Sequence, residues 1–126
     1  MVNNDFITTT LVDLVKINSV NPDLEKGGPG EIEIGTYIHN TLLTLGFHST
    51  IATISDGRMN IVGKRAGASK GRSLILNAHM DTVGVKGMND PFGATIKDGK
   101  LFGRGAYDMK GSIAAMLGEA KTISDQ

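Results

Sequence analysis

The sequence contains no cysteine among its 126 residues, so neither disulfides nor thiolate metal ligands are available. This absence fits a reducing compartment. No apolar run approaches the roughly 20 residues of a membrane-spanning helix, and the N-terminus lacks the continuous apolar core of a signal peptide. We therefore expect a soluble, cytoplasmic protein with no membrane partner.

An excess of charge of either sign is also lacking. Thirteen basic residues balance thirteen acidic ones, and neither sign forms a long block. This balance gives no basis for electrostatic capture of nucleic acid or of an anionic membrane. What the chain has in quantity is glycine, with 17 residues clustered between apolar segments. Such clustering indicates tight turns around a sheet.

Helical and strand patterns alternate along the chain. The predicted elements are helices at 6–20 and 31–45, strands at 47–54, 59–63 and 73–78, a hairpin at 94–97 and 100–103, and a helix from 109 onward. Leu74, Ile75 and Leu76 are consecutive, which is typical of a central strand buried on both faces. The alternation predicts a layered α/β/α domain with a mostly parallel, mixed central sheet.

Two polar residues directly follow the predicted central strand. His79 and Asp81 are two positions apart, so on an extended chain their side chains point to the same side. In open α/β sheets, ligands bind outside the carboxyl ends of the strands. The imidazole of His79 can bind a metal while Asp81 accepts a hydrogen bond from its other ring nitrogen. For this pair taken alone, the simpler alternative is a histidine that forms a structural hydrogen bond at the end of the strand.

A third candidate, Asp108, follows the turn Gly103-Arg104-Gly105 and precedes the last predicted helix. Metal binding is one role for it, and capping of that helix is the alternative. A strand, Gly-x-Gly and helix also begin a dinucleotide-binding turn. That fingerprint requires glycine or alanine where Asp108 stands, and its carboxylate would repel a pyrophosphate, so we rank the nucleotide reading low.

Other polar residues have simpler interpretations. His39 lies within the second predicted helix, next to Ile38, and is expected to be solvated or at the edge of the core, and His48 is expected to be exposed. Lys110 is interpreted as a solvated helix side chain or as a partner of the Asp108 carboxylate. For Arg104, contact with substrate and hydrogen bonding to nearby carbonyls both remain open.

The combination of motifs resembles one family of two-metal amidohydrolases and metallopeptidases. The motifs are His79-Met-Asp81-Thr-Val, Asn-Asp-Pro-Phe, and Gly103-Arg-Gly-Ala-Tyr-Asp108-Met-Lys-Gly. The family includes acetylornithine deacetylase, succinyl-diaminopimelate desuccinylase, aminoacylase and carboxypeptidase G. The resemblance implies hydrolysis of an amide bond in an N-acyl amino acid or small peptide.

The resemblance also implies a role for each of the three residues. His79 would bind one metal, Asp108 would bridge two metals about 3.5–4 Å apart, and Asp81 would orient His79 during catalysis. Imidazole and carboxylate ligands suit zinc, with cobalt and manganese open. The expected cofactors are therefore two divalent metal ions, zinc first.

Family members continue with a Glu-Glu pair, which supplies the general base and a metal ligand, and with further ligands and an inserted lid or dimerisation domain. None of these has a counterpart here. The resemblance thus implies that residues 1–126 are the N-terminal portion of the catalytic domain and are inactive alone. The alternative is a natural short protein that acts as a binding or assembly module, with homo-oligomers formed through an unpaired strand edge.

Overall fold

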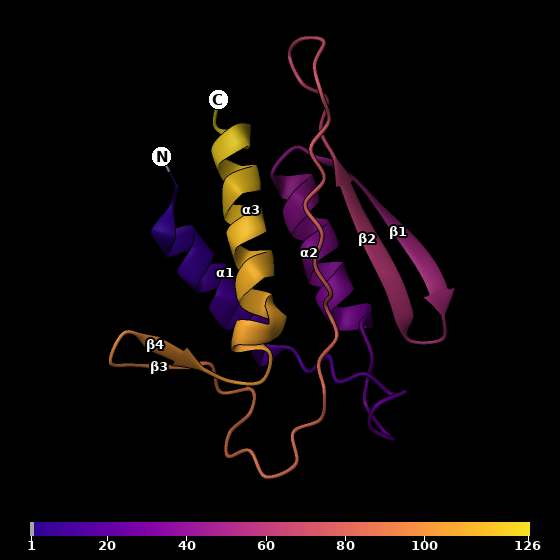
Figure 1. The fold of residues 1–126 in the computed structure, drawn as a ribbon, viewed down its shortest axis with the longest axis vertical. Helices are drawn as coiled ribbons and strands as arrows, with labels where there is room; N and C mark the ends of the chain where they lie inside the picture. The colour runs from indigo at the N-terminus through magenta and orange to yellow at the C-terminus, as the bar shows by residue number, and fades with distance from the viewer. Residues whose placement is uncertain (1) are drawn as a thin grey trace.

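The structure, a computed structural model, describes residues 2–126. Its elements are α1 (Asn4–Lys16), α2 (Ile32–Thr44), β1 (His48–Ser55), β2 (Arg58–Lys64), β3 (Thr95–Lys97), β4 (Lys100–Phe102), the short turn η1 (Ala106–Lys110) and α3 (Gly111–Ser124). The β1–β2 and β3–β4 hairpins lie on opposite sides of the helices (Figure 1). None of the helices in this described part is long and apolar enough to cross a membrane.

The first helix is shorter than predicted at its C-terminal end. The Asn3 side chain accepts a hydrogen bond from the amide of Phe6 at 2.9 Å and caps the N-terminus. At the other end, Ile17 is extended, and the Asn18 side chain accepts from the Val20 amide at 3.1 Å. This local turn replaces the helical bonds, so the prediction that the helix reaches Val20 was wrong.

The hydrophobic core lies between the three helices, and α2 also packs against both strands of the first hairpin. The buried core residues are Leu14, Ile34, Ile38, Ile113, Ala114 and Leu117. The predicted helical stripes of α2 and α3 are confirmed by this burial. Gly46, with φ of +75°, ends α2 as predicted, because its left-handed conformation stops the helix at no cost in side-chain strain.

Both predicted hairpins form. In β1–β2 the register pairs Ser49 with Gly63, and in β3–β4 it pairs Ile96 with Leu101. Asp98 and Gly99 have φ of 51° and 71°, which is the pair of positive values that a type I′ turn needs.

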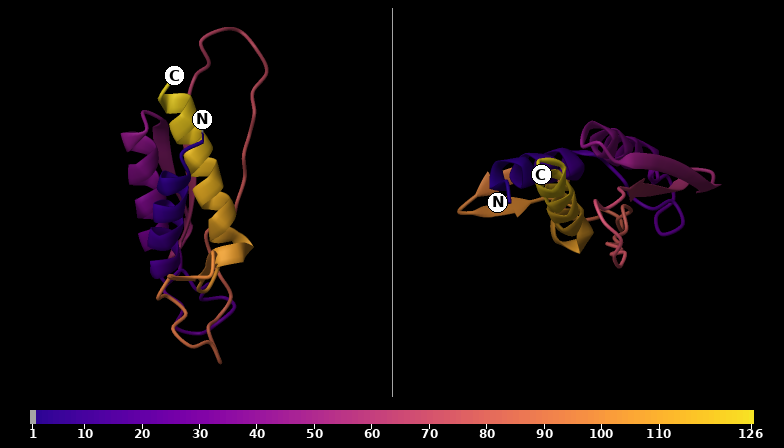
Figure 2. Two further views of the ribbon diagram at one scale, coloured as in Figure 1. Left: turned by 90° about the vertical axis from the view of Figure 1, so that its left-hand side faces the viewer. Right: turned by 90° about the horizontal axis from the view of Figure 1, so that it is seen from above.

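The predicted central strand at 73–78 does not form. Leu74, Ile75 and Leu76 are 83%, 85% and 53% exposed, and the described residues contain only two sheets, each antiparallel and two-stranded. The chain that follows β2 stands away from the helices before it runs back past them (Figure 2). A central strand needs hydrogen-bonded strands along its edges, and within residues 2–126 no strand is paired with this segment. The fold is therefore mixed α/β, without a layered parallel sheet in the described part.

Candidate metal site

The segment that carries His79 and Asp81 is extended and pinned at its end. Ala78 and Met80 pack against the core, so the residues between and after them face the other side. Thr82 forms a parallel bridge with Val20: its amide donates to the Ser19 carbonyl, and its carbonyl accepts from the Asn21 amide, both at 2.9 Å. The sequence-based expectation that His79 and Asp81 share a side agrees with this geometry.

The structure brings His79, Asp81 and Asp108 together. Nδ1 of His79 lies 3.0 Å from the backbone oxygen of Asp81 and 3.2 Å from its Oδ1. Nε2 lies 3.0 Å from Oδ1 of Asp108. Nδ1 has two acceptors beside it and Nε2 has one, so we assign the proton of the neutral ring to Nδ1. In the neutral ring Nε2 then holds a lone pair facing a carboxylate, an arrangement that calls for a cation or a proton between the two atoms.

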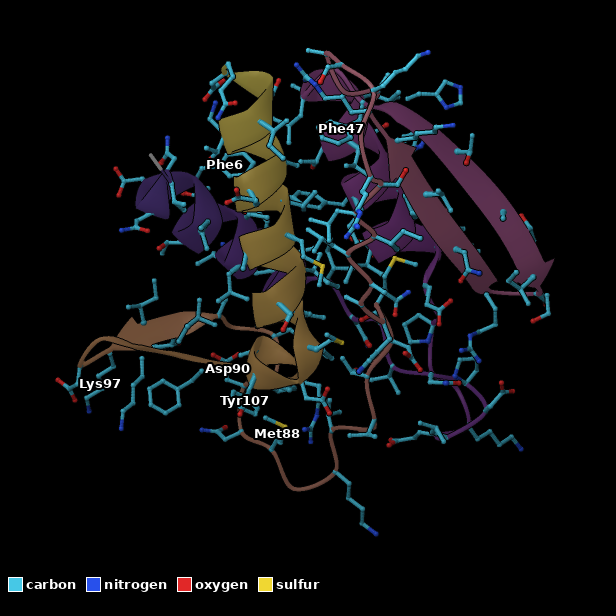
Figure 3. The ribbon with its side chains drawn as sticks, turned by 45° about the horizontal axis from the view of Figure 1, so that its top comes forward. Phe6, Phe47, Met88, Asp90, Lys97 and Tyr107 are labelled. Atoms are coloured by element: carbon cyan, nitrogen blue, oxygen red, sulfur yellow. The ribbon has the colours of Figure 1, made fainter. Side chains whose placement is uncertain are left out.

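Asp108 reaches this position through a sharp turn. Gly105 has φ of +78°, and Asp108 itself has non-helical angles, φ −115° and ψ 97°, with a cis peptide bond to Met109. The helix α3 starts only at Gly111, and no side chain caps it. The helix-cap alternative for Asp108 and the predicted start at Met109 are therefore wrong. Figure 3 shows Tyr107, which is 96% exposed, at the foot of α3 near the loop with Met88 and Asp90.

The environment of the imidazole ring raises the pKa of His79. Burial alone lowers it, but the hydrogen bond to Asp108, the bond to the Asp81 backbone and the two nearby carboxylate charges together raise it above the usual value. The two carboxylates thus stabilise the protonated form of the His79 ring.

The interpretation of Lys110 was wrong. This side chain is fully buried, and its Nζ donates to the Ile17 carbonyl at 2.7 Å. Burial lowers the pKa of Lys110 to about 8. Lys110 is therefore neither solvated nor paired with Asp108, and instead ties the turn η1 to the end of α1. His48 is exposed as expected, and His39 is half-buried with Nδ1 2.8 Å from the hydroxyl of Ser49.

A hollow of about 140 Å³ opens beside the ring of His79. It is lined by Leu24, His79, Asp81, Thr82, Val83, Arg104 and Asp108. The Nε atom of Arg104 is buried and has no hydrogen-bond partner among the described residues. The backbone amide of Arg104 donates to the Pro91 carbonyl at 2.7 Å. The geometry places Arg104 at the site and leaves its contact with substrate as a prediction.

Sequence reasoning missed the residues behind Asp81. Asn21 Nδ2 donates to Asp81 Oδ2 at 2.7 Å, and Arg58 Nη2 lies 3.8 Å from the same oxygen. Arg58 also pairs with the buried Glu31 at 2.8 Å. Glu31, Asn21 and Arg58 come from three separate segments, so no local spacing signals their meeting.

The donor atoms fit part of a metal site. Nε2 and Oδ1 are 3.0 Å apart, close to the separation of about 3.3 Å between two ligands of one tetrahedral zinc ion. Among residues 2–126, no group of three or more histidine, cysteine, aspartate or glutamate side chains is arranged to hold a metal ion, this site included. His79 and Asp108 therefore suit two coordination positions, with the remainder open to other ligands.

Comparison with known proteins finds a family and several relatives with similar sequences. Residues 75–126 match the model of the peptidase family M20/M25/M40. The chain is 37% identical over 111 residues to a probable succinyl-diaminopimelate desuccinylase of Staphylococcus epidermidis, covering 85% of this chain and 25% of that protein.

Two other relatives bear different names. An N-formyl-4-amino-5-aminomethyl-2-methylpyrimidine deformylase of Bacillus subtilis is 39% identical over 98 residues, 73% of this chain and 23% of that protein. An uncharacterized metallohydrolase of Methanococcus maripaludis is 38% identical over 121 residues, 83% and 28% respectively. The chain thus spans about a quarter of the length of the curated relatives it matches.

Proposed function

Because this chain belongs to the peptidase family M20/M25/M40, we propose that the protein hydrolyses an amide bond in an N-acyl amino acid or small peptide with bound divalent metal ions. Relatives named desuccinylase and deformylase support removal of an acyl group from nitrogen. A relative named metallohydrolase supports metal use. The observation that carries the proposal is the 3.0 Å approach of His79 Nε2 to Asp108 Oδ1.

The site residues take distinct roles in this proposal. His79 would hold a metal ion through the lone pair of Nε2, and the exposed carboxylate of Asp108 would hold the same ion and a second one. Asp81 accepts the Nδ1 proton and so fixes the tautomer in which Nε2 is free. Zinc is the first choice, with cobalt and manganese open. When bound, such ions polarise a substrate carbonyl and lower the pKa of water towards about 7.

A general base is not evident in the hollow. Of its lining residues, Asp81 and Asp108 are the carboxylates, and both are engaged with His79. Removal of a proton from water needs a carboxylate or imidazole free to accept it. We propose that the 126-residue chain alone binds zinc weakly and does not hydrolyse amides. In the longer relatives, we propose that the part outside the matched region supplies the remaining groups.

Zinc titration of the metal-stripped chain, followed by nuclear magnetic resonance, tests the site. We expect weak uptake that perturbs the signals of His79, and we expect His79→Ala and Asp108→Asn to abolish it. His48→Ala is the matched control, because His48 is exposed on β1 and should leave zinc uptake unchanged. Equal zinc affinity in the wild type and His79→Ala would refute the proposed site.

Amide hydrolysis by the pure chain is the second measurement. We expect no turnover of N-succinyl or N-formyl amino acids with zinc, cobalt or manganese present. Turnover that His79→Ala abolishes would contradict the inactivity of the chain while supporting its proposed chemistry.

The exposed apolar run favours one alternative function, a binding or assembly module. Leu74, Ile75 and Leu76 together form an unpaired extended segment that a second copy could pair with. Sedimentation over a range of concentrations tests it: reversible dimerisation that Ile75→Lys abolishes would support assembly, and a monomer at all concentrations would remove it.

A further inference from the structure

We infer that Arg58 is a positioning residue: held by Glu31, it fixes the Asp81 carboxylate, and through Asp81 it fixes the ring of His79. The inference rests on the proposed function, since it concerns how that same site presents a metal ligand. Arg58 touches neither ring nitrogen of His79, so its action passes through Asp81.

The two oxygens of Asp81 face opposite ways. Oδ1 lies 3.2 Å from His79 Nδ1, while Oδ2 accepts from Asn21 Nδ2 at 2.7 Å and lies 3.8 Å from Arg58 Nη2. The side chain is only 18% exposed. Tilting this carboxylate away from its present plane therefore weakens the contacts at both oxygens, so the orientation of Oδ1 towards His79 depends on what holds Oδ2.

The guanidinium of Arg58 uses separate nitrogens for separate acceptors. Nε donates to Glu31 Oε1 at 2.8 Å, Nη1 donates to Asp23 Oδ2 at 2.8 Å, and Nη2 faces Asp81. Nη1 also lies 3.3 Å from Asn21 Oδ1, so Asn21 is bound to both Arg58 and Asp81. A planar fork of fixed geometry can hold several segments at once, whereas a lysine offers one ammonium at the end of a flexible stem.

Glu31 makes this fork rigid. Its side chain is 7% exposed, and its second oxygen accepts from the Met59 amide at 3.0 Å. The Glu31 amide in turn donates to the Gly57 carbonyl at 2.8 Å. Glu31 thus holds the start of β2 against the start of α2. Because Arg58 is the first residue of β2, its position is fixed by the same bonds. The network joins the loop after α1, the start of α2, the hairpin and the His79 segment.

The test reads the ring of His79 directly, without metal. Long-range proton–nitrogen spectra of the metal-stripped chain with ¹⁵N-labelled histidine report the tautomer of each imidazole. Above the pKa of His79 we expect one tautomer, with the proton on Nδ1. In Arg58→Met and Arg58→Lys we expect a mixture of both tautomers, because Asp81 loses the ion pair with Arg58 and Asn21, its remaining partner at Oδ2, loses its own bond to Arg58.

The chain supplies its own controls. Lys64→Met removes the same charge from the exposed far end of β2 and should leave the His79 tautomer unchanged. His39, whose Nδ1 contacts Ser49 on β1, reports in the same spectrum whether the hairpin still packs on α2. Arg58→Lys keeps a positive charge beside the carboxylates of Asp23, Glu31 and Asp81. It therefore provides the test if Arg58→Met does not fold. An unchanged His79 tautomer in folded Arg58→Lys would overturn the inference.

Zinc affinity separates this inference from the proposed function. If both hold, folded Arg58→Lys should bind zinc about 10–100-fold more weakly than wild type, while Lys64→Met binds equally. If His79→Ala binds zinc as well as wild type does, the proposed metal site fails, and the tautomer measurement still decides the role of Arg58. Equal zinc binding by wild type and folded Arg58→Lys, with binding that depends on His79, would count against the inference.

Discussion

Asp81 and Asp108 flank the same imidazole but are held in opposite ways. The Asp81 side chain is 18% exposed and is fixed by Asn21 and Arg58 on the side away from His79. The Asp108 side chain is 81% exposed, and His79 is its one hydrogen-bonding partner among the described residues. One carboxylate is thus part of the protein framework, and the other is presented to solvent and to ligands.

The backbone around Asp108 is fixed although its side chain is exposed. Asp108 sits in a turn whose Gly105 packs against Thr82 and Lys110, and buried Lys110 ties that turn to Ile17. Asp108 is therefore positioned through its backbone and has an exposed side chain, whereas Asp81 is held through its side chain as well as through the neighbouring Thr82 bridge. The comparison teaches that a site can fix the orienting group and leave the ligating group adaptable. Four predictions test this division, from the largest effect to the smallest.

Gly105→Ala should disturb the backbone that holds Asp108. A Cβ there would lie 2.7 Å from Thr82 Cγ2 and 3.2 Å from Lys110 Cδ, and φ is +78°. Strain and overpacking together should lower the free energy of unfolding by about 3 kcal/mol, measured by urea denaturation. Gly99→Ala is the matched control, with φ of +71° and open space around it, and should cost about 1 kcal/mol. Equal losses at both positions would contradict tight packing of the Asp108 turn.

Lys110 should make stability depend on pH. Its pKa is about 8 in the folded chain against an ordinary 10.5, so the unfolded chain binds more protons between those values. The free energy of unfolding of the wild type should therefore rise, relative to Lys110→Met, as pH increases from 8 towards 10.5, by up to about 3 kcal/mol. Tyr37, whose pKa is raised by burial and by Asp13, changes the free energy of unfolding in the opposite direction as pH rises. Because both proteins contain Tyr37, its contribution cancels when the value for Lys110→Met is subtracted from that for the wild type. A flat difference across this range would show that Lys110 is hydrated.

Asp81→Asn and Asp108→Asn compare the two carboxylates directly. The first replaces an acceptor that serves Asn21 and Arg58, and should lower the free energy of unfolding by about 1–3 kcal/mol. The second changes an exposed group, and should stay within about 0.5 kcal/mol of wild type. Urea denaturation at neutral pH measures both. Equal losses would mean that the two aspartates are held alike.

Ile75→Thr should have the smallest effect. Its side chain is 85% exposed, so we expect a change in the free energy of unfolding within about 0.5 kcal/mol and no change in the His79 tautomer. The same substitution at fully buried Ile34 is the matched comparison and should cost several times more. A large loss at Ile75 would show that the run packs as a strand and that Asp81 depends on it.

The local pattern of the sequence determined much of this protein. Helical spacing predicted the core faces of α2 and α3, Asp98-Gly99 predicted its hairpin, and the motifs around His79 and Asp108 predicted the family and the three residues that meet. These features depend on neighbours in the chain or on motifs read in one stretch, because turn geometry and helical periodicity are local properties.

Only the tertiary structure decided the rest. The run Leu74–Leu76 has the composition of a buried strand, yet its burial depends on partners elsewhere, and here it is exposed. Lys110 is buried because the Ile17 carbonyl, 93 positions away, offers an acceptor inside the fold. The same holds for Arg58, Glu31 and Asp81, since ion pairs between distant segments leave no periodic trace in the sequence.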